Sequence, residues 1–487
     1  MPTARLHGWS AAPRVGLVIP EDGGPGWADA AFWGAQLTAW GVPWRPFAPG
    51  GETEPRWTTV IVPTQAVDPR LADRLASIDD VSLLLAGAAT AGSDALAERA
   101  MVTRFPRSAD RLDPRTSEEM VDAAWGTLPA AAPGGLVSIW RWPGRAEVAL
   151  VVDGDVDHPT GVDPECARYV APAIETAQRA GFDAYGIFAA GANVDAEPGS
   201  FPAGADYYNH SYSHPYSHWN DEPWEALDET RMRDELVRSE KTFRTHLGVS
   251  DHGMFRLPHF QLEAFERTFD VLESLGYLAE SSIGANVAIT AGLPFHPARR
   301  AWSDRGEDAG YARTHPDPAE RRPFLQLPIS TDPTDTAFPN GCCSYNTLDE
   351  GVRARTAEPS AYEEVLQTVV DVAAARRGLA HLFIDPPDAG YGRLAGDAVN
   401  YASAVERWLA HTVARRDVAL MSAAGLAQWW LARERAVGSM STMARDGHLR
   451  VRLLDPPSGA ALAVRAPGPD AAWRRIPIAD PIPEETR

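Results

Sequence analysis

The sequence predicts an α/β protein in which a small doubly wound α/β domain is followed by a distorted (β/α) barrel and then by a short β appendage. Strand-like apolar runs alternate with helix-like segments over most of the chain. Residues 130–135 are rich in Ala, Pro and Gly, as a linker is, and the residues after 436 change to short alternating runs around 455–459, typical of a hairpin. We therefore expect domains at 1–130, 136–435 and 436–487.

The composition is that of a globular protein with many loops. The chain has 487 residues, 44% of them hydrophobic, with 40 Gly and 41 Pro, so several domains are expected. Its 66 acidic and 45 basic residues give a net charge of -21, which disfavours nucleic acid and anionic membranes as partners. Only 3 cysteines occur, and no stretch resembles a signal peptide or a membrane span. We expect a cytoplasmic protein without a disulfide framework.

The first domain shows strand-like runs at 15–20, 59–63 and 81–87, with a helical period at 29–40. This spacing indicates a small parallel sheet covered by helices. The pattern resembles the flavodoxin-like layout of glutamine-amidotransferase-type domains. Because activity in that family needs a nucleophilic cysteine and none precedes Cys166, we expect a scaffold or a wall of the substrate site.

Repeated strand and helix units between residues 148 and 421 favour a barrel of parallel strands. In a barrel, catalytic groups lie at the carboxyl ends of the strands, where Asp155, His210, Arg256 and Asp385 fall. The strand-like segments are 148–152, 184–191, 205–209, 324–329, 379–384 and 418–421, and the helical ones are 172–180, 232–247, 265–275, 362–376 and 400–414.

His210 and His214 are candidate metal ligands. They are one helical turn apart, so both imidazoles can face one point if a strand runs into a turn of helix. Such a pair also arises by chance, and ordinary packing is the alternative for the pair alone. The carboxylates of 153–157, at the end of a buried strand, supply a third ligand. Two imidazoles and a carboxylate, with one position left for water, suit a catalytic zinc-type site.

Three motifs follow one another along this segment. A hydrophobic strand ends in the aspartates of 150–157; His210-Ser-Tyr-Ser-His214 comes next; and Phe255-Arg256-Leu257-Pro258 is the third. Residues 148–430 thereby resemble the polysaccharide deacetylase (NodB-homology) family, also called carbohydrate esterase family 4. Segments 184–191 and 427–430 resemble the family's strand before its first histidine and the end of its domain.

The resemblance implies a metal-dependent hydrolase that removes an N-acyl group from an amino sugar, a sugar-containing small molecule or an oligosaccharide. It implies Zn²⁺ or another divalent transition metal, held by Asp157, His210 and His214. Asp155 is then the general base, and Arg256 keeps this carboxylate charged and oriented. A second register remains open, in which Asp153 and Asp155 take the roles of Asp155 and Asp157.

The chain departs from the family pattern in its last motif. There the family has a hydrophobic strand that leads to a histidine with the role of general acid, whereas here the strand leads to Asp385. His381 is four positions earlier and is expected at the opposite end of the strand. Asp385 is either the general acid or a group that binds the substrate. Pro258, His259 and Trp219 are candidate substrate-binding residues.

Two other functions are considered. One is a hydrolase of non-sugar amides or cyclic imides on the same barrel. The other is a pseudoenzyme that binds carbohydrate without turnover, which the replaced histidine makes conceivable. Retention of every expected ligand counts against the pseudoenzyme, because buried carboxylates and imidazoles without a role are costly. A serine hydrolase is disfavoured, since no Gly-x-Ser-x-Gly elbow occurs.

Overall fold

The structure is a computed structural model of the chain. It describes residues 3–7, 9, 12–21, 24–47, 57–78, 80–97, 101–107, 114–157, 164–215, 223–249, 253–258, 265–282, 297–301, 321–330, 359–386, 401–467 and 472–478.

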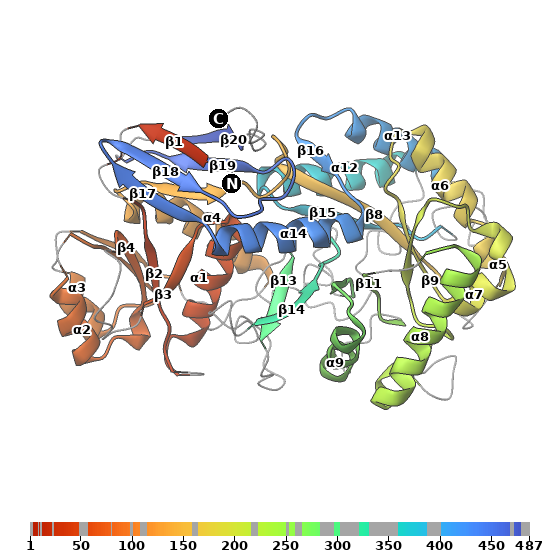
Figure 1. Cartoon of the computed structure of the whole chain (residues 1–487), viewed down its shortest axis with the longest axis horizontal. Helices are drawn as coiled ribbons and strands as arrows, with labels where there is room; N and C mark the ends of the chain where they lie inside the picture. Colours follow the sequence, from red (N-terminus) through yellow and green to blue (C-terminus); the bar gives the residue numbers. More distant parts are fainter. Residues whose placement is uncertain are drawn as a thin grey trace, which may run out of the picture.

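A curled sheet of nine strands forms the centre of the molecule (Figure 1). Its order is β13-β14-β12-β11-β10-β9-β8-β15, with β16 also paired to β8, and every pairing is parallel except that of β13 with β14. The α/β class and the barrel-type parallel sheet expected from the sequence are confirmed. The strands are β8 (Val148–Val156), β9 (Gly186–Ala189), β10 (Asp206–Asn209), β11 (Met254–Phe255), β12 (Ala279–Glu280), β13 (Ala298–Ala301), β14 (Arg321–Gln326), β15 (Leu379–Phe383) and β16 (Val418–Leu420).

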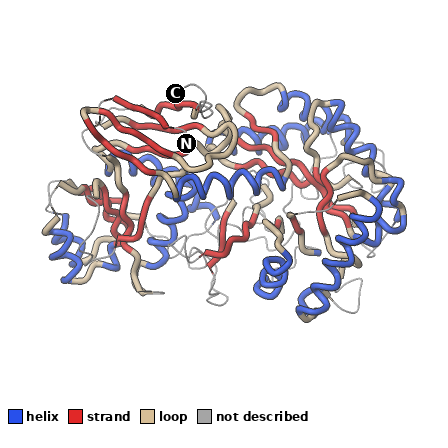
Figure 2. The backbone as a smooth tube through the Cα atoms, in the orientation of Figure 1, coloured by secondary structure: helices blue, strands red, loops and turns tan. Residues whose placement is uncertain are grey.

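Strand β8 is buried along its whole length because elements cover both faces of the sheet (Figure 2). Val148, Leu150 and Val152 belong to the core that also contains side chains of α6, α12 and α13. Ala149 and Val151 belong to a second core shared with α14. The helices are α5 (Pro164–Ala167), α6 (Val170–Arg179), α7 (Gly191–Ala196), α8 (Glu229–His246), α9 (Phe265–Leu275), α12 (Pro359–Ala375), α13 (Ala402–Val413) and α14 (Ala423–Gly438).

The first part of the chain forms a separate five-stranded parallel sheet in the order β3-β2-β4-β5-β6. Strand β2 lies inside this sheet, with β3 on one side and β4, β5 and β6 on the other. Its strands are β2 (Val15–Val18), β3 (Trp44–Phe47), β4 (Thr59–Pro63), β5 (Ser82–Ala86) and β6 (Val102–Phe105), and its helices are α1 (Trp27–Trp40), α2 (Pro69–Ala76), α3 (Ala91–Ala97) and α4 (Pro114–Ala131).

The β appendage contains strands from distant parts of the chain. One three-stranded sheet has the order β1-β18-β17, and a second has the order β20-β19-β7. Strands from residues 3–7 and 136–139 therefore complete the sheets of the third predicted domain. The bounds are β1 (Thr3–His7), β7 (Leu136–Ile139), β17 (Ser441–Arg445), β18 (His448–Arg452), β19 (Ala461–Arg465) and β20 (Trp473–Pro477).

Helix α1 ends against the barrel at Gly41. This glycine has φ +68°, and a Cβ there would lie 2.3 Å from the carbonyl oxygen of Ile139. The buried Arg433 of α14 donates hydrogen bonds to the carbonyls of Thr38 and Ala39 in the last turn of α1. A cation at these carbonyls complements the negative end of the helix dipole.

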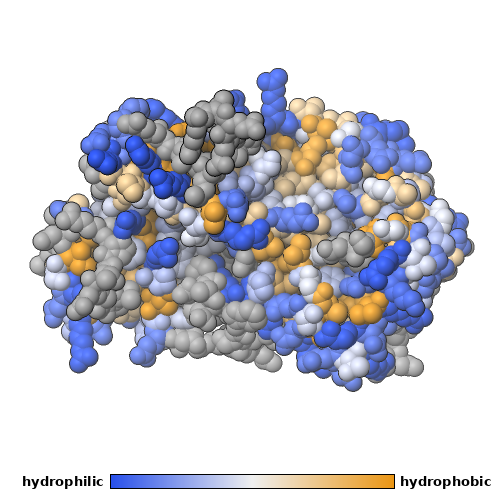
Figure 3. Space-filling model, viewed as in Figure 1, coloured by the Kyte–Doolittle hydropathy of each residue, from blue (hydrophilic) through white to orange (hydrophobic). Residues whose placement is uncertain are grey.

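The surface of the described residues carries both apolar and hydrophilic side chains. In the space-filling view apolar residues form several separate small patches among hydrophilic ones (Figure 3). No helix in the described part of the chain has the length and apolar character needed to cross a bilayer.

Candidate metal centre and active site

The carboxyl ends of adjacent parallel strands place the predicted site residues together. Asp155 is the eighth residue of β8, and His210 and Arg256 directly follow β10 and β11. Strands β8, β9, β10 and β11 are consecutive neighbours in the sheet, so their ends meet at one edge.

The segment from His210 to His214 is a tight loop and not the turn of helix that the spacing suggested. Ser211 has φ +67° and His214 has φ +51°, a left-handed conformation that costs energy in residues other than glycine. Side chains hold this loop in place. The Ser211 N–H donates to Asn209 Oδ1 (2.8 Å), and the His214 N–H donates to Ser211 Oγ (3.1 Å).

Glu235 of α8 is a third anchor of the same loop. Its carboxylate accepts hydrogen bonds from the backbone N–H of Tyr212 (2.9 Å), from the backbone N–H of Ser213 (2.7 Å) and from Ser213 Oγ (2.9 Å). Three bonds to one charged acceptor fix the two residues between the histidines. Sequence reasoning missed Glu235, because nothing local to α8 indicates which loop its polar face contacts.

Asp157, His210 and His214 converge on one point. One ligand atom from each lies within 4.8 Å of the others. Asp157 Oδ2 lies 2.7 Å from His214 Nε2 and 4.0 Å from His210 Nε2. Both imidazoles are buried, whereas the Asp157 side chain is 20% exposed, so the point can be reached from solvent.

The protonation of His210 fits a metal ligand. Its Nδ1 lies 2.9 Å from the carbonyl oxygen of Arg256, and because a carbonyl only accepts, Nδ1 carries the hydrogen. Burial and the neighbouring His214 lower the pKa of His210 to about 3, so the ring is neutral at pH 7. Its Nε2 is buried without a hydrogen-bond partner among the described residues. A neutral imidazole with a free, buried Nε2 suits a divalent metal ion.

Asp155 lies between the histidines and a buried cation. Its Oδ1 accepts a hydrogen bond from Arg256 Nη1 (2.6 Å), and its Oδ2 lies 3.4 Å from His210 Nε2. Burial raises the pKa of Asp155 to about 7; Arg256 opposes this rise and Asp157 adds to it. A carboxylate with such a pKa can take up a proton near neutral pH.

Arg256 lies at the centre of a network of buried hydrogen bonds. Besides Asp155 it donates to Asp153 Oδ1 (2.8 Å) and, through Nε, to the carbonyl of Ser281 (2.7 Å). Its guanidinium lies over the rings of Phe188 (4.0 Å) and Phe383 (4.9 Å). Burial works to lower its pKa, but the two aspartates hold the pKa well above the usual arginine value.

His381 lies in the middle of β15, and the expectation that it sits at the far end of the strand is wrong. In the register of β15 with β8, His381 pairs with Val151 and Phe383 pairs with Asp153. Residues two apart on a strand share a face, so His381 faces the same side as Asp153. The sequence Leu-Ala-His-Leu-Phe of 379–383 has no alternation of apolar and polar residues that would have indicated this face.

Asp385 lies beside the end of β8. Its Oδ1 accepts a hydrogen bond from the backbone N–H of Asp155 (2.5 Å), and its side chain is only partly buried. Gly154 makes this approach possible, since a Cβ there would lie 2.1 Å from the carbonyl oxygen of Ile384.

Of the three predicted substrate-binding residues, only Pro258 lies among the described residues; it is buried and follows Arg256 by two positions in the sequence. His259 and Trp219 lie outside them. The nearby Trp224 is fully buried; it packs on Phe255 and donates from Nε1 to Thr268 Oγ1 (2.9 Å). Trp224 is therefore a core residue.

This chain is similar to known proteins in structure but not in sequence. No family model and no curated protein sequence matches the chain. The chain is similar in structure to polysaccharide deacetylases. A candidate polysaccharide deacetylase from Mycobacterium smegmatis matches at 17% identity and a TM-score of 0.41, over 60% of this chain and 93% of that one.

Two further matches are to carbohydrate esterase family 4. A pseudoenzyme of this family from Bacillus anthracis matches at 10% identity and a TM-score of 0.27, over 58% of this chain and 66% of that one. A family 4 acetyl xylan esterase from Clostridium thermocellum, in complex with a cobalt ion, matches at 15% identity and a TM-score of 0.22, over 48% of this chain and 87% of that one.

Proposed function

We propose that the chain is a hydrolase that depends on a divalent metal ion, most suitably Zn²⁺, and removes an N-acyl group from an amino sugar or a sugar-containing small molecule. The observation that carries this proposal is the convergence of Asp157, His210 and His214 beside a second carboxylate, Asp155, which an arginine holds in place. Three side-chain ligands leave room for water and substrate, as catalytic sites require.

The residues divide the chemistry between them. A metal ion bound by the three ligands would lower the pKa of a coordinated water and polarise the acyl carbonyl. Asp155 accepts the proton of the attacking water at Oδ2, the oxygen that faces His210. Arg256 binds the other oxygen of Asp155 and so fixes the direction of the free one. His210 is held by its Nδ1–H bond to the Arg256 carbonyl, which directs Nε2 into the site.

The substrate class rests on the motif resemblance and on charge. With a net charge of -21, the protein favours a neutral or cationic substrate, such as an N-acyl amino sugar, over an anionic polymer. A non-sugar amide or a cyclic imide would meet the same catalytic groups, so both classes belong in the test.

The test combines metal analysis with an assay of acyl release. Wild-type protein, His210→Ala and His214→Ala would be compared for bound metal, with His411→Ala, an exposed histidine of α13, as the matched control. Acetate and formate release would be followed over N-acyl sugars, small amides and cyclic imides. We expect about one metal ion per chain in wild type and in the control, and loss in the other two. Equal metal in the wild type and all three variants contradicts the proposal, and bound metal without turnover of any compound supports the pseudoenzyme.

A further inference from the structure

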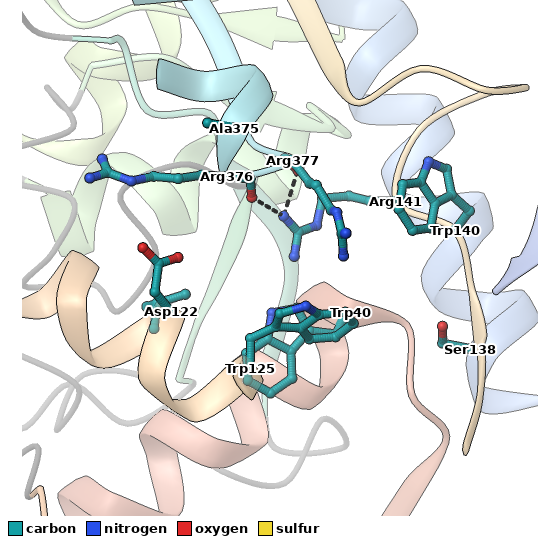
Figure 4. Close-up of a pocket in the computed structure, with 10 residues that line it drawn as sticks. Trp40, Asp122, Trp125, Ser138, Trp140, Arg141, Ala375, Arg376 and Arg377 are labelled. Carbon is teal, nitrogen blue, oxygen red and sulfur yellow. Dashed lines mark hydrogen bonds between the residues drawn. The ribbon is translucent and has the colours of Figure 1, made fainter. Parts of the chain in front are cut away.

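A pocket of about 140 Å³ lies between the first domain and the barrel, away from the candidate active site. Helices α1 and α4 supply one side, and the residues around β7 and before β15 supply the other (Figure 4). Because Arg377 precedes the amino end of β15, the pocket is at the opposite end of this strand from Asp385. The lining residues that carry the argument are Trp40, Asp122, Trp125, Trp140, Arg141 and Arg377.

The pocket is cationic in a strongly acidic protein. Arg141, Arg376 and Arg377 line it against a single acid, Asp122. Arg141 is only 7% exposed. Its hydrogen bonds to described residues go to the backbone carbonyls of Ala39, Arg376 and Arg377. Carbonyls satisfy its N–H groups but leave a full positive charge, so the pocket favours an anion.

Arg377 has a hydrogen-bond donor that no described residue satisfies. Its Nη1 is buried and has no hydrogen-bond partner among the described residues, although its Nε lies 3.6 Å from Glu147 Oε2. The backbone of Arg377 has φ +55°, and Arg141 and Trp142 both donate to its carbonyl oxygen. An anionic acceptor bound to this partly exposed guanidinium would supply the charged partner that the carbonyl-rich surroundings lack.

Indole rings form the rest of the wall. The rings of Trp40 and Trp125 are 5.0 Å apart, and the Arg377 guanidinium lies 5.5 Å from the ring of Trp125 and 5.1 Å from the ring of Trp140. Figure 4 shows Trp40 and Trp125 together, across from Arg141 and Arg377. Indole faces bind flat ring surfaces, both aromatic rings and the apolar faces of sugars.

Size limits the ligand. The pocket volume of about 140 Å³ is smaller than the roughly 300–1,000 Å³ of pockets that hold drug-sized ligands, so the pocket suits a small ligand. A compound with one six-membered ring and one carboxylate belongs to this size class, whereas a nucleotide or an oligosaccharide is larger.

We propose that this pocket is a binding site for a monocyclic carboxylate, with the carboxylate on the guanidinium of Arg377, whose side chain is 35% exposed, and the ring against the part of Trp125 that Trp40 and Trp473 leave uncovered. The site is independent of the proposed hydrolase activity, because none of its residues belongs to the metal centre. Aromatic acids and sugar acids share the required chemistry, and the test distinguishes between them.

Titration calorimetry on the full chain tests the proposal with matched probes. Benzoate and glucuronate carry both ring and charge; benzamide and glucose keep the ring without the charge; inorganic phosphate keeps the charge without the ring. We expect benzoate or glucuronate to bind at least tenfold more tightly than its neutral counterpart and than phosphate. Equal binding of acid and neutral probe in both pairs, or no binding of either acid at millimolar concentration, overturns the proposal.

Variants assign the binding to this pocket. Arg377→Gln should weaken binding of the acid roughly tenfold or more, because a charge-assisted hydrogen bond is lost. Asp122→Asn, at an exposed position of α4, should strengthen it about threefold, since a nearby like charge is removed. Arg416→Gln, an exposed arginine elsewhere, is the control and should change nothing. Unchanged binding in Arg377→Gln with an unchanged thermal midpoint overturns the assignment, as does weaker binding in Asp122→Asn.

Discussion

His381 Nε2 lies 2.6 Å from Asp153 Oδ2, and neither side chain is exposed to solvent. The other oxygen of Asp153 accepts from Arg256, whose second nitrogen holds Asp155. A chain of buried contacts thus runs from β15 through Asp153 and Arg256 to Asp155. In the preferred register, Asp153 is a positioning residue that acts on Asp155 through Arg256, and this arrangement predicts a specific dependence of stability on pH.

Asp153→Asn should destabilise the protein by about 3 kcal/mol at pH 7, because Arg256 and His381 lose a buried charged partner. Burial works to raise the pKa of Asp153, but Arg256 and His381 together hold it below the ordinary value. The folded pKa is therefore below the unfolded pKa, which is about 3.9. The charged carboxylate stabilises the fold above this unfolded value, and its contribution is lost as the pH falls through the folded pKa.

Urea unfolding of wild type and Asp153→Asn from pH 2.5 to pH 7 would measure this effect. The difference in free energy of unfolding should be constant near neutral pH and should shrink below pH ~4. A difference that stays constant or grows on acidification would contradict the assignment of a charged, paired Asp153.

Glu235 should control metal affinity without touching the metal. Because its carboxylate holds the N–H groups of Tyr212 and Ser213, Glu235→Ala should free the loop that carries both histidines. Removal of a group that orients a metal ligand typically lowers metal affinity 10- to 100-fold, and we expect a loss of this size in Glu235→Ala. Competition with a chelator would measure it. The metal affinity of Glu235→Gln should lie between those of Glu235→Ala and wild type. Asp234→Asn, which changes an exposed neighbour on α8, should have the metal affinity of wild type. Equal metal affinity in all variants would show that the loop keeps its shape without Glu235.

Substitution of Asp155 should lower turnover, whereas substitution of Asp157 should lower metal binding. Asp155→Asn should keep the metal and lose roughly 100-fold in kcat, the usual scale for loss of a general base. Asp157→Asn should lose the metal, since its Oδ2 is 2.7 Å from His214 Nε2. Metal content and kcat would be measured on the same samples. If Asp153→Asn is the variant that retains metal but not activity, the alternate register is correct.

The parts of the site that the sequence predicts are those set by strand direction. Carboxyl ends of parallel strands meet at one edge, so residues that follow apolar runs, such as Asp155 and His210, could be grouped without a structure. Glu235 and His381 could not, because their roles depend on which helix face and which strand register meet the site. The pairing of β1 with β18 is likewise a contact between distant segments, which local pattern does not encode.

Asp385 occupies the position where the resemblance leads one to expect a histidine acid, and its contacts favour binding over proton donation. Its Oδ1 accepts the N–H of Asp155, and a hydrogen bond of this kind stabilises the charged carboxylate. The side chain is only partly buried, so desolvation opposes this charge less than it does for Asp155. A carboxylate that stays charged cannot protonate a leaving amine, but it can bind a hydroxyl or cationic group of the substrate.

We therefore expect Asp385→Asn to raise KM about tenfold with kcat changed less than about threefold, because one charge-assisted contact to substrate is lost while the amide oxygen still accepts from Asp155. Asp385→Ala should also lower kcat, since the end of β8 loses that bond. Steady-state kinetics from pH 5 to pH 9 for wild type, both variants and Asp385→His would decide the role. A collapse of kcat in Asp385→Asn that Asp385→His restores would instead identify Asp385 as the general acid, because only a group that can donate a proton would then support expulsion of the amine.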